Sequence, residues 1–492
     1  MLPAASGLPS RPLSLSAPVS APSTSRHGRP SLRRLPLSAQ RLIVIGGGTG
    51  CNAVLPAFHG SVRTTFIVPI SDDGGSTAEV LRVLGGPALG DIRSRLIRLI
   101  PASPPDSPLF CIRRLLEYRL PGSSTSHAEI KMEWHQIVEG SHKLWKGFNF
   151  KKASIGNLFL SGASLFLGSV PSAIFLFASL TGIPHDTFAV VPVINTSSTV
   201  TIAAELEDGT IIAGQSEISH PSPSSPTRSI LSPATRAPSP VSSPTAAVFD
   251  PSTNLCPPSI SIFPLTRATT PSFPEPPVLG AEEEDDMRDP GSPDPNPNGT
   301  SGDTRDQSRN IEFSKDADES PPLQARIRRV FYLNAYGSEI FPRPNGLFLE
   351  SLQTSTSLIY APGSLYTSIL PCLVLRAVGD LIATSPSLQA KILLLNSKLD
   401  RETPGYTALD FVRAITDACA RAYGEEHRGA WAYEPRDVVT HVVYVKGGDV
   451  EVEKDALEAL GIQLVAVGPL ENAMFDDEVV REALERIFSS EA

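Results

Sequence analysis

Residues 42–50 read LIVIGGGTG, an apolar run that passes directly into a glycine-rich segment. The run Leu42 to Ile45 predicts a buried strand, and residues from about Thr49 to Phe58 predict a helix. Glycine lets a backbone turn sharply and approach an anion closely, and the amides at a helix N-terminus face phosphate. We therefore expect this loop to bind the phosphates of a ligand, with a tight turn that binds nothing as the alternative. The predicted ligand-binding residues are Gly46, Gly47, Gly48, Thr49 and Gly50.

The second predicted strand, Thr64 to Ile70, ends in the segment SDDGGS at residues 71–76. Its adjacent carboxylates, Asp72 and Asp73, can bind ribose hydroxyls or hold a divalent cation. We predict that both aspartates are catalytic residues and metal ligands, and an Asx turn that caps the next helix is the alternative. The ligand contacts predicted for the rest of this segment are Gly74, Gly75 and Ser76.

A helix is predicted from Asp91 to Leu99, with Asp91 at or near its N-cap. Arg93 is predicted to be catalytic, because a guanidinium group matches planar oxyanions. Arg95 could also reach a phosphate, but for Arg95 and Arg98 a solvated helix face is an equal alternative.

Two loops in the second half of the chain also follow candidate strands. The strand Ser357 to Tyr360 precedes a loop rich in glycine and hydroxyl groups, and Lys391 to Leu395 precedes residues 396–403. Backbone amides and hydroxyls in such loops make nests for phosphate. The residues predicted to bind the ligand here are Gly363, Ser364, Thr367 and Ser368.

Strands that alternate with helices predict an α/β fold, a three-layer sandwich with a mainly parallel sheet that binds ligands beyond the carboxyl ends of its strands. A stretch of Ser-Pro steps and acidic residues separates the predicted strands, and neither side alone supplies a complete sheet. We expect one domain that is interrupted by a disordered insertion, since a long surface loop costs little extra closure entropy. The predicted parts are a disordered leader (1–40), the first part of the domain (41–220) with a helical elaboration (101–150), the insertion (221–322) and the second part of the domain (323–492).

Charge and cysteine usage narrow the function classes. A formal net charge of -10 argues against a nucleic-acid partner. The cysteines are scattered and form no CxxC pair, which argues against a disulfide framework or a zinc site and favours the cytoplasm. The acid-free leader leaves an organelle as the alternative. The uncharged stretch from Leu158 to Ile183 could span a membrane, but Gly168 and Pro171 interrupt it, which predicts two short buried helices instead.

Taken together, GGGTG at 46–50, SDDGGS at 71–76, GDIR at 90–93, GNL at 156–158 and PGSLYTSI at 362–369 resemble the CofD/YvcK family. This family comprises 2-phospho-L-lactate transferases and gluconeogenesis-factor-like proteins. The resemblance implies a Rossmann-like sheet with a nucleotide-binding cleft, and the insertion resembles a eukaryotic, fungal version of the family. It also implies that Asp72 and Asp73 hold Mg²⁺ or a substrate hydroxyl, and that Asn157 and Asn396 line the cleft.

The resemblance implies two alternative functions. Transferase members move a 2-phospholactyl group from a guanosine-diphosphate-type donor onto a deazaflavin alcohol, with Mg²⁺. Gluconeogenesis-factor members bind UDP-sugars and regulate carbon use and cell-wall metabolism. The family often has Gly-His-Ser-Phe-Gly-Asn where this chain has residues 152–157, and this change favours the regulator.

The expected partner is a small nucleotide ligand of the GDP or UDP type, with no nucleic acid and no membrane. The Ser-Pro and Thr-Pro steps of the insertion are candidate kinase sites. The sequence does not decide the oligomeric state, and a homodimer is one possibility.

Overall fold

The computed structural model describes residues 35–105, 107–120, 148, 152–219, 322–421, 433–469 and 474–489. These residues belong to one compact unit, which joins the chain up to Ser232 with the chain from Ser308 onward. The predictions for the leader up to residue 34, for the helical elaboration between 121 and 147 and for the insertion between 220 and 321 lie outside the described residues.

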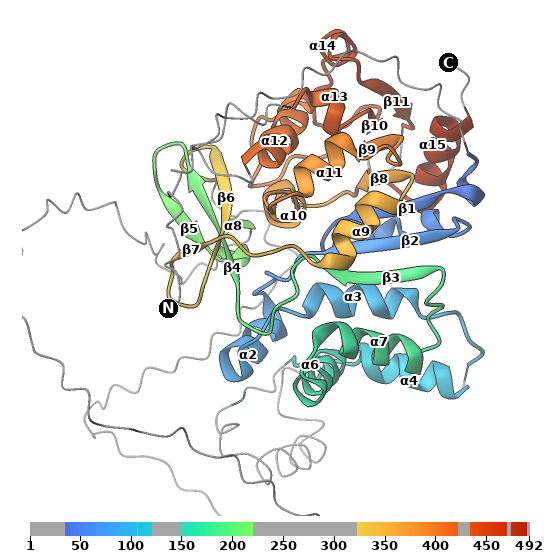
Figure 1. Cartoon of the computed structure of the whole chain (residues 1–492), viewed down its shortest axis with the longest axis vertical. Coiled ribbons are helices and arrows are strands. Elements are labelled where there is room, and N and C mark those ends of the chain that lie inside the picture. The colour runs from blue at the N-terminus through green and yellow to red at the C-terminus, as the bar shows by residue number, and fades with distance from the viewer. Residues whose placement is uncertain are drawn as a thin grey trace, which may run out of the picture. The chain divides into compact units, whose positions relative to one another are not determined.

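A seven-stranded sheet in the order β11-β10-β9-β8-β1-β2-β3 forms the centre of this unit (Figure 1). All neighbouring strands in it run parallel. Every residue of β8 and β9 is buried, so helices cover both faces of the sheet, and the predicted α/β fold is confirmed. The strands are β1 (Arg41–Ile45), β2 (Arg63–Val68), β3 (Phe188–Pro192), β8 (Ser357–Tyr360), β9 (Ala390–Leu394), β10 (His441–Val445) and β11 (Gln463–Val467).

The strand order reverses beside β1. From β1 the chain continues through β2 to β3 on one side, whereas β8 to β11 extend the sheet on the other side. Ile45 therefore pairs with Ile67 on one side and with Tyr360 on the other. A crevice opens at such a reversal because the loops after the two strands lead in opposite directions.

The predicted helix from 49 to 58 is divided at Val54 into a short α-helix and a 3-10 helix, in which Pro56 has no N–H to donate. Helix α9 contacts β1 and β3 and packs on α11, while α3 contacts β3 and α1. The helices are α1 (Thr49–Ala53), η2 (Leu55–Phe58), α2 (Gly75–Leu84), α3 (Gly90–Leu99), α4 (Pro108–Glu117), α6 (Ile155–Leu167), α7 (Val170–Leu180), α8 (Gln215–Ser219), α9 (Gly346–Thr354), η4 (Leu365–Ile369), α10 (Leu370–Leu373), α11 (Val378–Thr384), α12 (Ala408–Arg421), α13 (Pro435–Val438), α14 (Lys454–Ala459) and α15 (Asp477–Ser489), with η1 (Leu37–Ala39) before β1.

A second, four-stranded antiparallel sheet was not predicted. The apolar segments Thr210–Gly214 and Ile327–Leu333, which the sequence also predicts as strands on the two sides of the insertion, belong to this sheet and not to the parallel one. Its central pair, β4 and β6, aligns Thr201 with Leu333 and so joins segments from both sides of the insertion. The sheet order is β5-β4-β6-β7, with β4 (Thr201–Leu206), β5 (Ile211–Ala213), β6 (Ile327–Leu333) and β7 (Glu339–Ile340).

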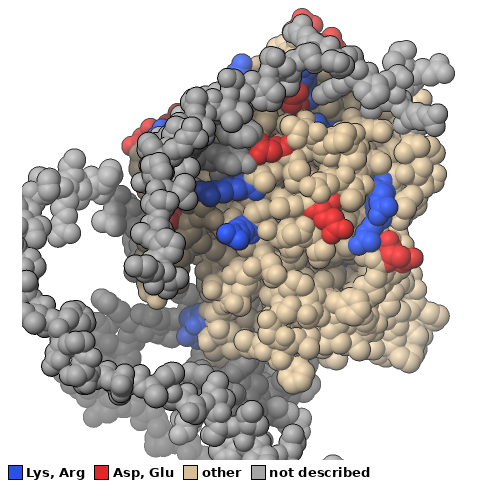
Figure 2. Space-filling model, in the orientation of Figure 1, with Lys and Arg blue, Asp and Glu red and all other residues tan. Residues whose placement is uncertain are grey.

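The uncharged stretch after Asn157 forms α6 and α7, and the chain breaks between them at Gly168, which has a left-handed backbone. The expectation that both helices are buried is wrong for their outer side, where Phe166 is 89% exposed and Phe175 is 62% exposed. The part of the surface around these helices carries no charged side chain in Figure 2. This apolar side does not touch the pocket described below.

Within the described ranges, no single helix is both long enough and apolar enough to cross a membrane. The segments Leu365–Leu373 and Val378–Thr384 meet the length and composition only as a pair, and they are bent by 81° relative to each other.

The strand pairing predicts the effect of removing residues 233–307. All strands of both sheets lie outside this segment, so a chain that joins Ser232 to Ser308 retains every described contact. We expect its melting temperature to stay within about 2 °C of that of the full chain, which corresponds to a change in the free energy of unfolding of less than about 1 kcal/mol. Thermal unfolding followed by circular dichroism measures this, and a loss of the cooperative transition would contradict the single interrupted domain.

Candidate functional site

A pocket of about 580 Å³ lies beyond the carboxyl ends of β1, β2 and β8, where the strand order reverses. Its size is within the range of small-molecule sites. The loops after these strands line it, together with the first turns of α2, α3 and α6. The predicted site residues in its lining are Gly47, Gly48, Gly50, Asp72, Gly74, Gly75, Ser76, Arg93, Asn157, Gly363, Ser364 and Ser368.

The other predicted residues do not line the pocket but support residues that do. Asn396 accepts a hydrogen bond from the Gly363 N–H at 3.1 Å and donates one to its carbonyl at 2.8 Å. Thr367 donates to the buried carboxylate of Glu402 at 2.7 Å. Gly46 lies in the buried first part of the glycine loop, and Thr49 begins α1.

The first glycine loop rests on the side chain of Arg95. This guanidinium is 1% exposed, donates to the Gly47 carbonyl at 2.8 Å and lies over the ring of Phe66, with 5.0 Å to the ring centroid. The expectation that Arg95 either reaches a phosphate or lies on a solvated helix face is therefore wrong. Its cation holds the loop from the buried side, because the loop carbonyls there have no water to bond to.

The two glycine loops approach each other so closely that side chains would not fit between them. A methyl group on Gly50 would lie 2.6 Å from the Pro362 carbonyl oxygen, and one on Gly47 would lie 2.6 Å from the Ser368 hydroxyl. Both distances are shorter than a normal contact, so a side chain at either position would have to displace its neighbour. The loops after β1 and β8 thus form one continuous wall.

Asp72 and Asp91 bring two buried carboxylates to this wall. Burial raises the pKa of Asp72 to about 8, and the charge of Asp91 adds to the shift. Burial also raises the pKa of Asp91 to about 6, against the opposing effects of Arg95 and of the hydrogen bond from the Gly48 N–H. Two carboxylates with raised pKa values in one pocket favour a bound cation.

Asp91 does not cap α3 as expected. The N-cap of α3 is Leu89, and the Asp91 side chain in the first turn faces the first glycine loop instead. The sequence could have indicated this contact, because Asp91 lies at the start of a predicted helix at the same edge of the sheet as the glycine loop. Asp72 does form the Asx turn named as its alternative, since it accepts a hydrogen bond from the Gly74 N–H at 3.1 Å, and it lines the pocket as well.

Asp73 is not among the residues that line the pocket. Its carboxylate accepts a hydrogen bond from the Ser216 N–H at 2.8 Å and so holds the start of α8. Gly214 has a φ of +100°, and a methyl group there would lie 2.6 Å from the Asp73 carboxylate. The pair of acids that faces the pocket is therefore Asp72 with Asp91.

Sequence reasoning did not single out the rest of the lining. Arg119 and Lys152 lie in irregular segments on either side of residues 121–147, and although Lys152 opens the segment 152–157, neither side chain was predicted to contact the ligand. Ser219 ends α8 and donates a hydrogen bond to the buried carboxylate of Glu402, which Thr367 also contacts. The further residues in the lining are Thr77, Gly90, Ser94, Gln215, Ser216 and Pro362.

Buried polar atoms without a hydrogen-bond partner gather in this pocket. Among the described residues that line it, these atoms are Asp91 Oδ2, Arg93 Nε, Asn157 Oδ1 and Gln215 Oε1. Native proteins leave few buried polar groups unpaired, and each such group calls for an explanation. A polar ligand that enters the pocket would satisfy them together.

The described residues include no cluster of three or more His, Cys, Asp or Glu side chains that could hold a metal. Mg²⁺ does not require such a cluster, because it is commonly held by one or two carboxylates together with substrate phosphates and water. Asp72 and Asp91 fit this smaller donor set.

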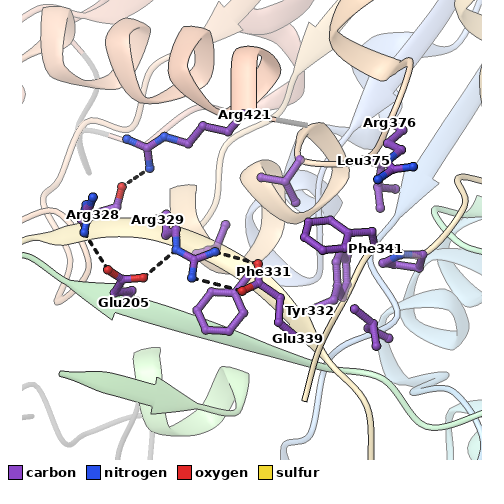
Figure 3. A pocket seen from close by; sticks show the side chains of 14 residues that line it. Glu205, Arg328, Arg329, Phe331, Tyr332, Glu339, Phe341, Leu375, Arg376 and Arg421 are labelled. Carbon is purple, nitrogen blue, oxygen red and sulfur yellow. Dashed lines mark hydrogen bonds and ion pairs between the residues drawn. The ribbon is translucent and has the colours of Figure 1, made fainter. Parts of the chain in front are cut away.

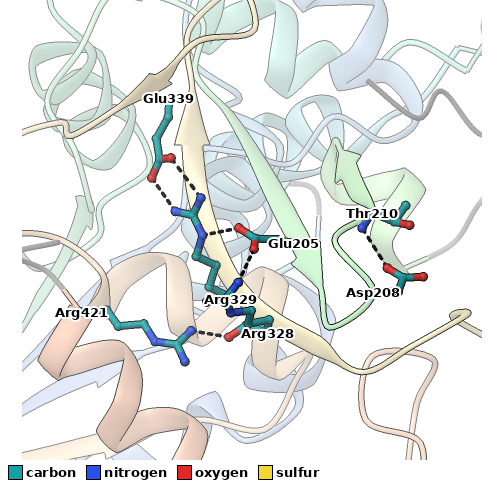
Figure 4. Close-up of polar contacts among 7 residues, drawn as sticks. All are labelled: Glu205, Asp208, Thr210, Arg328, Arg329, Glu339 and Arg421. Carbon is teal, nitrogen blue, oxygen red and sulfur yellow. Dashed lines mark hydrogen bonds and ion pairs between the residues drawn. The ribbon is translucent and has the colours of Figure 1, made fainter. Parts of the chain in front are cut away.

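A second pocket of about 340 Å³ lies between the antiparallel sheet and the segment that follows α10 (Figure 3). Its charged groups bind one another: Glu205 accepts from Arg328 at 2.9 Å and from Arg329 at 2.6 Å, and Arg329 also binds Glu339 (Figure 4). None of the unpaired buried atoms in the described residues lies in its lining. These ion pairs join β4, β6 and β7, so we assign them a structural role.

Comparisons with known proteins show the family and the fold of this chain. The family model described as 2-phospho-L-lactate transferase CofD matches residues 42–468. Uncharacterized protein YNL011C of Saccharomyces cerevisiae is 32% identical over 488 residues, which cover 91% of this chain and 98% of that protein. A gluconeogenesis factor of Halalkalibacterium halodurans is 25% identical over 437 residues, which cover 87% of this chain and 89% of its own. A crystal structure of a UPF0052 family protein from Bacillus halodurans shares the fold, with a TM-score of 0.53 and 19% identity over 91% of this chain and 99% of the other.

Replacing Gly50 tests the contact between the two glycine loops. We expect Gly50→Ala to lower the free energy of unfolding by about 1–3 kcal/mol, because the new methyl group must push the Pro362 carbonyl away. Gly162→Ala is the matched control: Gly162 lies within α6, has open space around it, and is expected to gain up to about 1 kcal/mol of helix stability. Chemical denaturation measures both, and equal stability of the two variants would rule out the close contact.

Replacing Asp72 tests whether its carboxylate is buried and repelled by the carboxylate of Asp91. An acid whose folded pKa is raised loses stability as the pH increases from its unfolded pKa near 4 towards its folded pKa of about 8. Asp72→Asn removes this loss of stability. In metal-free buffer we therefore expect the variant to have a higher melting temperature than the native chain. We expect the difference between the two melting temperatures to be at least about 2–4 °C larger at pH 8 than at pH 5. A difference that shrinks with increasing pH would contradict the buried, repelled carboxylate.

Proposed function

Since this chain belongs to the CofD family, we propose that its pocket binds a nucleoside-diphosphate-type ligand with Mg²⁺ and transfers a phosphate-linked group from that ligand to an alcohol. The observation that carries the proposal is the gathering of unpaired buried polar atoms, acidic and basic, beside two glycine loops in one pocket. A ligand with phosphate oxygens, a bound cation and hydroxyl groups would satisfy these atoms. An apolar ligand would leave them unpaired.

Asp72 and Asp91 would hold the magnesium ion in this proposal, and Asp73 would not, because it is engaged with α8. Without a cation, the two carboxylates would repel a diphosphate. When bound, Mg²⁺ supplies charge neutralisation for the phosphate oxygens during transfer. Gly50 and Gly363 would bring the backbone close to the diphosphate from the other side.

The proposed transfer requires little from the protein beyond position and charge. The acceptor hydroxyl oxygen forms a bond to the phosphorus that carries the transferred group, and the bond from that phosphorus to the bridging oxygen breaks. The nucleoside monophosphate leaves with the electron pair of that bond, and the hydroxyl proton is released to solvent. The Ser76 hydroxyl accepts a hydrogen bond from Asn157 at 3.1 Å, so its own proton is available to orient a ligand oxygen.

A binding function without catalysis is the second candidate. The described lining contains no histidine or cysteine side chain, so its proton acceptors are the same two carboxylates that the cation would occupy. A pocket of this kind can bind a sugar nucleotide tightly without turnover. The motifs that resemble gluconeogenesis-factor-like proteins imply a UDP-sugar, which is therefore the first ligand to test for this function.

Titration calorimetry of the full chain with GDP, UDP and a UDP-sugar, each with and without Mg²⁺, tests the proposed site. We expect Mg²⁺ to tighten binding of at least one of these nucleotides about tenfold or more, and we expect Asp72→Asn and Asp91→Asn to abolish this gain. Asp73→Asn is expected to keep the magnesium dependence, and Asp186→Asn, an exposed residue away from the pocket, is the neutral control.

Chromatography of the same mixtures with an alcohol acceptor separates the two candidate functions. Release of nucleoside monophosphate together with a phosphodiester product supports transfer, whereas tight binding of a UDP-sugar without any product supports the regulator. Absence of nucleotide binding in every condition would end both.

A further inference from the structure

A further pocket of about 360 Å³ lies at the opposite ends of α2 and α6 from the pocket beyond β1, β2 and β8. Both helices begin beside the latter pocket, where Ser76 of α2 and Asn157 of α6 line it. Leu84, the last residue of α2, and Gly168, the C-cap of α6, line the further pocket, which we call the helix-end pocket. The two linings share no described residue, and the ten residues of α2 span about 15 Å between them. The protein therefore has room for two separate ligands.

The described lining of the helix-end pocket contains no charged side chain. Its size is within the range of small-molecule sites. Hydroxyl and amide side chains share this lining with apolar ones, among them Leu89 and Val170. The polar side chains are those of Ser161, Ser164, Ser169, Asn195, Thr196 and Ser197. An ion that entered this pocket would lose water without gaining a countercharge, so the lining favours an uncharged ligand.

The ends of two helices add hydrogen-bond acceptors to this lining. Helix α2 ends at Gly85, which has a φ of +69°, and α6 ends at Gly168, which has a φ of +65°. The last carbonyls of a helix have no intrahelical donor, and they carry the negative end of the helix dipole. Helix α7 begins in the same lining, but Pro171 has no N–H, and the Ser172 N–H already donates to the Ser169 hydroxyl at 3.2 Å. The pocket therefore favours ligands that donate hydrogen bonds and disfavours anions.

The side chain of Ser161 gives an independent indication that this pocket binds a ligand. Ser161 is 7% exposed, and its hydroxyl has no hydrogen-bond partner among the described residues. A serine within a helix commonly donates to the carbonyl four residues earlier, which belongs to Asn157 here, but Ser161 does not. A buried hydroxyl without a partner reduces stability, and a ligand hydroxyl in this pocket would pair with it.

We propose that the helix-end pocket is a second ligand site, which binds an uncharged molecule with several hydroxyl groups, a sugar or another polyol. Each hydroxyl of such a molecule can donate to a helix-end carbonyl and accept from a serine. Its C–H groups can pack on the apolar side chains of Leu89 and Val170. This site differs in ligand class from the pocket beyond β1, β2 and β8, which is lined by charged groups of both signs. The inference does not depend on the function proposed for that pocket.

Saturation-transfer NMR of the full chain with glucose, galactose, mannitol and myo-inositol tests this site. We expect at least one of these polyols to bind with a Kd below about 5 mM. Ser161→Ala is expected to weaken that binding at least about fivefold. The same variant is expected to keep or raise the melting temperature, because it removes an unpaired hydroxyl and places a better helix former in α6. Removing a hydroxyl with a purely structural role would lower the melting temperature instead.

Ser351→Ala is the matched control, because Ser351 lies on α9 outside the pocket lining and its hydroxyl donates to the Leu347 carbonyl at 2.7 Å. Asp72→Asn alters the pocket beyond β1, β2 and β8 and is expected to leave polyol binding unchanged. The proposal is overturned if no polyol binds, if Ser161→Ala binds as tightly as the native chain, or if Asp72→Asn abolishes the binding. Glucuronate, the anionic counterpart of glucose, tests the ligand class. Binding of glucuronate that Ser161→Ala removes would contradict a site for uncharged ligands.

Discussion

The pairing of β1 with β8 is the constraint on which the site depends. Ile45 and Tyr360 are neighbours in the sheet although they are far apart in the sequence, and both are fully buried. Both faces of this strand pair are buried, so a shift by one residue would exchange the side chains that pack against the two helical layers. Because the strands are parallel, their following loops leave the sheet at the same edge, and the contact between Gly50 and Pro362 follows from this register.

Three charged side chains, Arg95, Asp91 and Asp72, lie next to one another beneath and beside the first glycine loop. The buried guanidinium of Arg95 supports the loop carbonyls, and a buried cation needs a nearby negative charge. Asp91 supplies that charge one helical turn earlier on α3, which places its carboxylate beside Gly48 and in the field of Asp72. Burial underlies both features: it leaves the loop carbonyls to bond to Arg95, and it raises the pKa of both carboxylates, although the Arg95 charge acts against the shift at Asp91. In the proposed function, the two carboxylates bind a cation, and the bound cation then attracts an anionic ligand.

Sequence patterns predicted the parts of the fold whose signal is local. Apolar runs that end in glycine located β1 and β8, and the polar segment after Thr64 to Ile70 located Asp72. The role of Asp73 could not be read in this way, because adjacent side chains on an extended backbone point to opposite sides and only the fold decides which side is the pocket. Arg119 and Lys152 carry no periodic signal at all, since a bridge between two irregular segments brings them to the site. The antiparallel sheet was missed for a related reason: β4 and β6 pair across the insertion, and long-range pairing leaves no pattern in either segment alone.

The two pockets show how similar residues can serve opposite purposes. In the pocket beside the antiparallel sheet, Arg329 is held by Glu205 and Glu339, so its charge is already neutralised and stabilises the join between strands. In the pocket beyond β1, β2 and β8, Arg93 has no such partner among the described residues, and Asp91 retains an unpaired oxygen. Unpaired buried charges reduce the stability of the empty protein, and this loss is recovered when a complementary ligand binds. The ligand proposed for this pocket, which combines a cation with phosphate oxygens, would pair with both kinds of charge at once.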